Sequence, residues 1–106
     1  MMVEEQDRKD AVLLAMSDHY MRRILAATMV DDKSIDEISK EKVIPVSTCY
    51  RRVHELVGLR LLRIERTVIT ETGKKYETYR SAFRDAKISM SSGELEVEVT
   101  VTPLIK

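Results

Sequence analysis

The chain has 106 residues and carries 18 Lys and Arg against 18 Asp and Glu, so its formal net charge at pH 7 is zero. This length predicts one domain with a single core, and a composition of 43% hydrophobic and 34% charged residues with three glycines argues against a mainly disordered chain. The longest uncharged stretches, 11–17 and 24–30, are far shorter than the roughly 20 apolar residues that span a bilayer.

The first third of the chain is predicted to be helical. Its N-terminus is mixed and mostly acidic, where a signal peptide would be basic and then apolar, so we expect a cytoplasmic protein. Apolar residues then indicate a first helix over 8–16 and a second over 17–30, which Ser17 would begin as the N-cap. A buried stripe at i, i+3, i+4 and i+7 is predicted on the second helix, formed by Met21, Ile24, Leu25 and Thr28.

Two further helices follow at short intervals. The third is predicted over 34–42, because Ser34 and Glu37 have the spacing of a capping box. The fourth is predicted over 45–57, because Pro45 has a helical φ and lacks an N–H that a first-turn residue could not use. At about 100° per residue this helix separates two faces. Its apolar face holds Cys49, Val53, Leu56 and Val57, and its polar face holds Ser47, Arg51 and His54, flanked by Thr48, Tyr50 and Glu55.

The second half of the chain is predicted to form two β-hairpins. The first joins 61–70 to 74–81 around Gly73, where β-branched residues and tyrosines replace the helical period. In the second, a two-residue turn at Ser92 and Gly93 sets the cross-strand register. That register pairs Met90 with Leu95, Ile88 with Val97, Ala86 with Val99 and Lys87 with Glu98, and leaves Glu94, Glu96 and Glu98 on one solvated face.

Positive charge is concentrated in the middle of the chain. The segment 51–84 holds nine Lys and Arg against four Glu, and the remainder holds nine against 14. A local positive footprint of this kind is typical of a surface that meets a polyanion, although a solvated basic surface has the same composition.

The order of the predicted elements is that of a helix-turn-helix with a wing. The fold class is therefore α+β: a single domain over 1–106, with helices and wing over 8–81 and an extra C-terminal hairpin over 82–106. The stretch SIDEISKEKVIPVSTCYRRVHELVGLRLL resembles the helix-turn-helix of ArsR-type and related archaeal winged-helix transcription regulators, and TETGKKYETYR resembles their wing. The resemblance covers about 17–81, and it implies a homodimer that sets two recognition helices in successive major grooves of double-stranded DNA.

The chain departs from this family in two ways. Val43 and Arg60 stand where the family usually has glycine, before and after the recognition helix, and a β-branched residue resists a left-handed backbone, so we expect the turn at Val43 to take another shape. The family's metal-sensing pair of cysteines is missing, and His19 and His54 lie 35 residues apart, so we expect no metal site. We also expect no cofactor, and the sequence does not indicate an effector.

Seven residues are the candidates for DNA contact. On the fourth helix, the Arg51 guanidinium suits guanine or a phosphate, and the flexible charges of Lys74 and Lys75 beside the wing turn suit backbone phosphates. The other candidates are Ser47, Thr48, Tyr50 and His54. Each also has a plain structural reading: the hydroxyls support the start of the helix, the tyrosine packs on the first hairpin, and the other side chains are simply solvated.

Three other functions compete with DNA binding. An enzyme is disfavoured, because the chain offers no nucleophile or acid–base motif, no phosphate-binding glycine loop and no metal spacing. A winged-helix module that binds another protein is the main rival. A thiol switch at Cys49 is weaker, since a thiol on an apolar helix face reacts poorly. We expect the homodimer to be joined through the N-terminal helix, where Leu13 and Met16 need a partner surface, through the C-terminal hairpin, or through both. For the C-terminal hairpin, the apolar alternation of Leu95, Val97, Val99 and Val101 predicts either a dimer interface or packing within the same chain.

Overall fold

The computed structural model describes residues 2–101, and for residues 2–7 it describes only the helical backbone. The predicted α+β class is confirmed: within the described residues, four helices are combined with small antiparallel sheets. The predicted C-terminal extension runs to residue 106, and its last five residues lie outside the described part. The helices are α1 (Met2–Met16), α2 (His19–Ala27), α3 (Ile35–Lys42) and α4 (Val46–Gly58).

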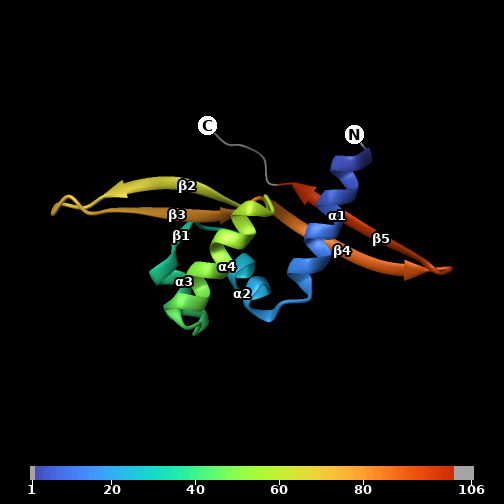
Figure 1. Cartoon of the computed structure of the whole chain (residues 1–106), viewed down its shortest axis with the longest axis horizontal. Coiled ribbons are helices and arrows are strands. Elements are labelled where there is room, and N and C mark those ends of the chain that lie inside the picture. Colours follow the sequence, from blue (N-terminus) through green and yellow to red (C-terminus); the bar gives the residue numbers. More distant parts are fainter. Residues whose placement is uncertain (1, 102–106) are drawn as a thin grey trace.

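Five strands are divided between two sheets within the described residues. The strands are β1 (Lys33–Ser34), β2 (Leu62–Ile69), β3 (Lys75–Ser81), β4 (Phe83–Ser91) and β5 (Glu94–Val101). The first sheet has the order β1-β3-β2, and the second is the β4–β5 hairpin. The two hairpins project in opposite directions from the helices (Figure 1), which gives the molecule extents of 57 × 32 × 21 Å.

Each predicted helix and hairpin is present, but some ends differ. α1 begins at Met2, earlier than the predicted start at residue 8. Ser17 is not the N-cap of α2, because its hydroxyl donates to the Leu14 carbonyl while Asp18 accepts the bond from the Met21 amide at 2.9 Å. α2 ends at Ala27, short of the predicted residue 30.

The end of α2 is fixed by a buried polar pair. Thr28 turns its hydroxyl back to the Ile24 carbonyl at 2.9 Å, and its Oγ1 lies 3.0 Å from Ser81 Oγ at the end of β3. The Ser81 hydroxyl donates in turn to the Leu25 carbonyl at 2.8 Å. These bonds satisfy helix-end groups that would otherwise be buried without a partner, and they join α2 to the first sheet.

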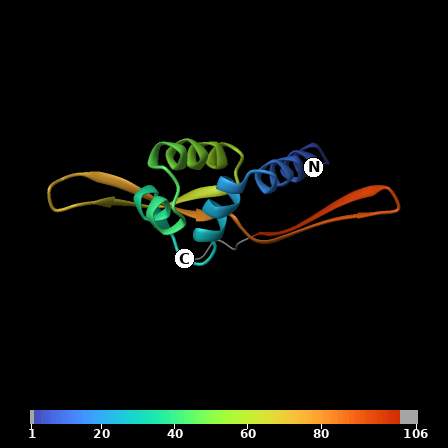
Figure 2. The ribbon, with the colours of Figure 1, turned by 90° about the horizontal axis from the view of Figure 1, so that it is seen from below.

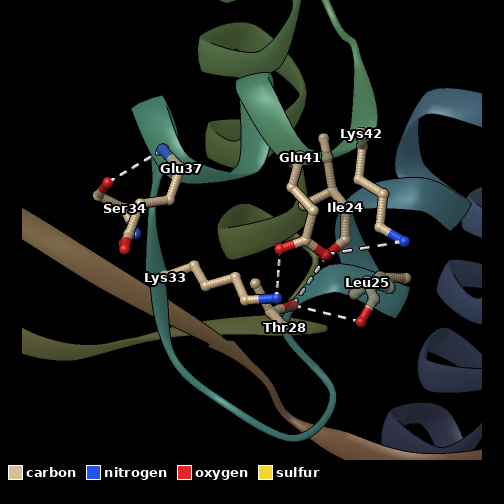
Figure 3. A network of polar contacts seen from close by, with 8 residues as sticks. All are labelled: Ile24, Leu25, Thr28, Lys33, Ser34, Glu37, Glu41 and Lys42. Atoms are coloured by element: carbon tan, nitrogen blue, oxygen red, sulfur yellow. Dashed lines mark hydrogen bonds and ion pairs between the residues drawn. The ribbon is translucent and has the colours of Figure 1, made fainter.

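α3 begins as predicted. Ser34 Oγ accepts from the Glu37 amide at 3.2 Å and Glu37 Oε1 accepts from the Ser34 amide at 2.8 Å, which completes the capping box. Lys33 in β1 holds the far end of α3 through Glu41, with Nζ and Oε1 2.6 Å apart (Figure 3). The helix is therefore attached to β1 at both ends.

The expectation that Val43 would avoid a left-handed backbone is wrong. Val43 ends α3 with φ 55° and ψ 58°, and the Ile44 amide donates to the Ser39 carbonyl at 3.0 Å. Arg60, after α4, is also left-handed with φ 65°. Both positions therefore adopt the glycine-type conformation without a glycine, because the buried Ile44 and Leu61 that follow them hold the chain direction.

One core lies beneath the helices and the inner ends of both hairpins. The predicted stripe of α2 is buried, as are Cys49, Val53 and Leu56 of α4, and Val57 is partly buried against them. Leu61, Leu62 and Tyr79 bring the first sheet into the same cluster. A single core spans the elements from α1 to β5.

The second hairpin has the predicted register. Met90 pairs with Leu95, Ile88 with Val97, Ala86 with Val99 and Lys87 with Glu98. α1 contacts β5, and midway along this strand Val97 is 7% exposed and belongs to the core. The inner part of the apolar face is thus covered within the chain, which is the second of the two predicted arrangements.

Candidate nucleic-acid interface

The outer face of α4 is polar and open to solvent. Ser47, Tyr50, Arg51 and His54 are exposed, whereas Cys49, Val53 and Leu56 face the core. Thr48 is half-buried at the side of the helix, so it does not share this open face fully. The helical spacing read from the sequence therefore separates the two faces as predicted.

Arg51 and its neighbour Arg52 have different surroundings. Arg51 is exposed, and it makes no ion pair with any described side chain. Arg52 is half-buried, with Nε 3.1 Å from Asp18 Oδ2 and Nη1 2.9 Å from Glu55 Oε1. The Arg51 fork is thus available to a ligand, and Arg52 is used to attach α4 to the start of α2.

Asp18 is the anchor of that attachment. Burial acts to raise the pKa of Asp18, but the bond from the Met21 amide and the charge of Arg52 lower it by more, so the net pKa is below its ordinary value. The carboxylate is therefore charged at neutral pH, where it caps α2 and binds Arg52 together.

A surface groove separates α4 from the β2–β3 hairpin. Four of the seven candidate residues line it: Tyr50 and His54 from α4, Lys74 from the turn before β3, and Lys75 as the first residue of β3. Ser47, Thr48 and Arg51 do not line it and lie elsewhere on α4. We call this feature the α4–hairpin groove.

The groove also contains residues that the sequence analysis did not single out. Tyr76 and Glu77 of β3 line it, together with Val46 at the start of α4 and Asp36 of α3. The available signal was the aromatic residue next to two lysines in KKYE. An aromatic side chain among cations is typical of nucleic-acid grooves, but only the folded arrangement places it opposite α4.

Aromatic rings on both sides give the groove its shape. The rings of Tyr50 and His54 are tilted by 49° with centroids 4.3 Å apart. Tyr79 lies deeper, and burial followed by the charge of Glu77 raises its pKa, so its hydroxyl stays protonated and donates to Glu77 Oε1 at 3.3 Å. The groove therefore combines aromatic rings with the positive charges of Lys74 and Lys75 and the negative charges of Asp36 and Glu77.

Asp32 fixes the hairpin to the helices. Its Oδ2 accepts from Thr78 Oγ1 of β3 at 2.5 Å and from Arg66 Nε of β2 at 2.7 Å. The bond from Thr78, followed by that from Arg66, lowers the pKa of Asp32 despite some burial. β1 adds backbone pairing beside it, with Lys33 opposite Tyr79 and Ser34 opposite Thr78.

Cys49 lies on the buried side of α4. Burial, followed by the negative charge of Asp36, raises the pKa of the thiol to about 11. The thiolate is the reactive form, so this side chain is unreactive at neutral pH and a thiol switch gains no support. Among the described side chains, no group of three or more His, Cys, Asp or Glu is arranged to hold a metal ion.

Comparison with known proteins adds no family to this description. A scan against protein-family models found no match to the chain, and a search of the curated proteins found no matching relative. Within residues 2–101, no helix has both the length and the apolar character needed to cross a bilayer.

Proposed function

We propose that the chain is a winged helix-turn-helix protein that binds double-stranded DNA sequence-specifically and regulates transcription. α4 is the recognition helix in the major groove, and the β2–β3 hairpin is the wing. The observation that carries the proposal is the outer face of α4. Ser47, Arg51 and His54 make this face polar and exposed, and it borders a groove with two lysines on the hairpin opposite.

The position of α4 supports this role. α2, α3 and α4 contact one another, and α4 packs its apolar side on the core while its opposite side faces outward. In Figure 2, α4 lies at the edge of the molecule away from the strands, and its outer residues Ser47, Arg51 and His54 are exposed. A major groove about 12 Å wide accepts an α-helix, and its base edges are read by side chains on that helix.

The charges support two kinds of contact. Arg51 is free for a bidentate bond to guanine O6 and N7, and Ser47 lies one helical turn before it on the same face. Lys74 and Lys75 are exposed point charges on the hairpin, suited to phosphate oxygens. Tyr50, His54 and the half-buried Thr48 lie beside Arg51 and complete the proposed contact set.

The resemblance to ArsR-type regulators belongs to the same proposal. It adds a homodimer, in which two copies of α4 read half-sites one helical turn apart. A single domain of this size has one such helix, and pairing doubles the interface that holds the complex on DNA.

A protein-docking module is the second candidate, and one observation favours it. Val46 is 54% exposed and Tyr50 58% exposed at the mouth of the α4–hairpin groove, and both are large apolar groups. Exposed apolar groups beside a groove also suit a peptide ligand. Arg51 distinguishes the two functions. DNA reading uses its guanidinium, whereas a peptide in the α4–hairpin groove does not, because Arg51 does not line that groove.

The test is a selection from random duplexes, followed by fluorescence anisotropy on the selected site. Arg51→Ala should weaken specific binding by roughly 1–3 kcal/mol and relax the base preference at one position of each half-site. Arg23→Ala, which removes an exposed charge from α2, is the matched control and should preserve that preference. If no sequence is enriched, the DNA proposal fails and the docking module becomes the leading candidate. If a sequence is enriched but Arg51→Ala binds it as tightly as the unmodified chain does, the assignment of Arg51 to a base contact fails.

A further inference from the structure

The outer half of the β4–β5 hairpin is an incomplete structure. It comprises two strands that extend beyond the helices, and in Figure 1 it projects past α1. An isolated two-stranded hairpin is at best marginally stable in water, and it gains independent stability from further strands or a covering helix. The inner half has such cover from α1, and the outer half does not.

The apolar face of this outer half is exposed. Met90 is 71% exposed, and its register partner Leu95 and the neighbouring Ile88 are also exposed. Leu14 of α1 is a further exposed large apolar residue. The outer half of the hairpin thus combines an apolar patch with two strand edges that pair with no other described strand, and both features are typical of association sites.

The two strand edges differ in charge. In antiparallel pairing of β5 with β5 of a second copy, the glutamates at 94, 96 and 98 come opposite one another in the central registers, and like charges placed directly opposite destabilise a sheet. β4 carries charges of both signs instead: Asp85 and Lys87 on its polar face, and the exposed Arg84 at the irregularity in register between Phe83 and Asp85. Asp85 and Lys87 are both exposed, and neither makes an ion pair with a described side chain.

We infer that two copies of the chain join through β4, forming a four-stranded antiparallel sheet in the order β5-β4-β4-β5. With Ala86 on the two-fold axis, Asp85 lies opposite Lys87 of the partner subunit, and Lys87 lies opposite Asp85 of the partner subunit. A two-fold axis of this kind makes the interface self-complementary, which fits a second copy of the same chain better than an unrelated partner.

In the same register, the exposed apolar groups of the hairpin lie beside the partner subunit. This register brings Met90 alongside the base of the partner's hairpin and keeps the apolar faces of both hairpins on one side of the joined sheet. Figure 2 shows α1 and α4 on a common side of the strands, so a two-fold axis perpendicular to the hairpin leaves both copies of α4 on the same side. The placement of both copies of α4 on one side matters only if α4 binds DNA, so this part of the inference rests on the proposed function. The assembly of two copies can be measured without DNA.

The experiment is sedimentation equilibrium of the full chain at micromolar concentrations in the absence of DNA. The unmodified chain should be dimeric. Asp85→Lys alone and Lys87→Asp alone each replace two attractions with two repulsions, so each should raise the dimer dissociation constant by about tenfold or more. The double variant Asp85→Lys with Lys87→Asp restores opposite charges across the two-fold axis and should recover most of the dimerisation. The remaining deficit is the cost of placing an aspartate opposite Glu98 of the same hairpin.

The most discriminating experiment is to mix the two single variants. One copy with lysine at 85 and 87 and one with aspartate at both positions are complementary, so an equimolar mixture should form a heterodimer although each variant alone is mainly monomeric. Circular dichroism of each variant shows that it is folded. Restoration in the mixture supports the β4 pairing, because a defect in folding would not be repaired by mixing.

A second pair of variants tests the apolar patch. Met90→Asp should shift the chain toward monomer, and Ile69→Asp, at a 70% exposed position on the other hairpin, should not. A monomeric unmodified chain overturns the inference. So does a dimer that is indifferent to all charge changes at positions 85 and 87. A monomer would also remove the homodimer from the proposed function. DNA binding by α4 is tested separately, by the selection from random duplexes and by Arg51→Ala.

Discussion

Val43 is the residue whose backbone conformation fits its side chain least well. It is β-branched, left-handed and 81% exposed, so it takes on the cost of that conformation without burying its side chain. For L-residues other than glycine this conformation costs roughly 1–2 kcal/mol. The turn between α3 and α4 is retained because Ile44, the next residue, is buried and fixes where α4 begins.

Val43→Gly should therefore stabilise the fold. Removing the Cβ relieves the strain, and the greater flexibility of glycine in the unfolded chain offsets part of the gain, so we expect roughly 0.5–1 kcal/mol. For a domain of this size, thermal unfolding should move up by about 2–8 °C. Val30→Gly is the control, because Val30 is 75% exposed with no positive φ, and it should lower the midpoint. A lower midpoint for Val43→Gly would show that the valine side chain itself supports the turn.

At the scale of single elements, the β2–β3 hairpin carries the charge effect that is easiest to measure. Replacing Lys74 and Lys75 with Ala should weaken binding to all duplexes by about the same factor. The log–log salt dependence should become less steep by up to about one unit for each lost phosphate contact. Base preference should persist, because point charges on phosphates do not read sequence.

The matched control removes the same charge elsewhere. Arg8→Ala with Lys9→Ala on α1 should leave the salt slope nearly unchanged. Anisotropy titrations between low and physiological salt give both slopes. A loss of base preference with an unchanged slope in the Lys74 and Lys75 variant would mean that the hairpin reads bases.

Elements specified by local chemistry were predictable from the sequence. The capping box at Ser34 and Glu37 and the turn at Ser92 and Gly93 each rest on residues a few positions apart, and both are confirmed. Ser17 and Asp18 are adjacent residues that can both cap a helix, and the structure uses Asp18, whose carboxylate also binds Arg52. Local pattern could not decide between them, because Arg52 is distant in the sequence.

Features that depend on distant segments were not predicted. β1 comprises two residues and exists because Lys33 pairs with Tyr79, which no periodicity in so short a segment can signal. The α4–hairpin groove likewise arises only when the hairpin packs beside α4, so Tyr76 could not be placed opposite His54 in advance. Sequence spacing predicted which side of α4 is polar, and the tertiary fold determined what lies across from it.

At the scale of the whole molecule, Asp32 links the helical part to the hairpin. It precedes β1 and binds both β2 and β3 through Arg66 and Thr78, so the orientation of the proposed wing relative to α4 depends on its charge. The carboxylate is mostly shielded, with a side-chain exposure of 23%, whereas Arg66 is 62% exposed and screened by water. A moderate contribution to stability is therefore expected.

Asp32→Asn should destabilise the fold by about 1 kcal/mol at pH 7, because the amide keeps a hydrogen-bond acceptor and loses the charge that Thr78 and Arg66 favour. The pKa of Asp32 is held below its ordinary value of 3.8, so folding favours the charged carboxylate. The contribution is then fully present above that value and is lost as pH falls through the lower pKa of the folded state. Denaturant titrations should show a constant gap between the variant and the unmodified chain from pH 7 to about pH 5, closing below about pH 4. Asp31→Asn, at the exposed neighbouring position, should show no such gap, and a gap that persisted undiminished under acid conditions would mean that the carboxylate charge contributes nothing.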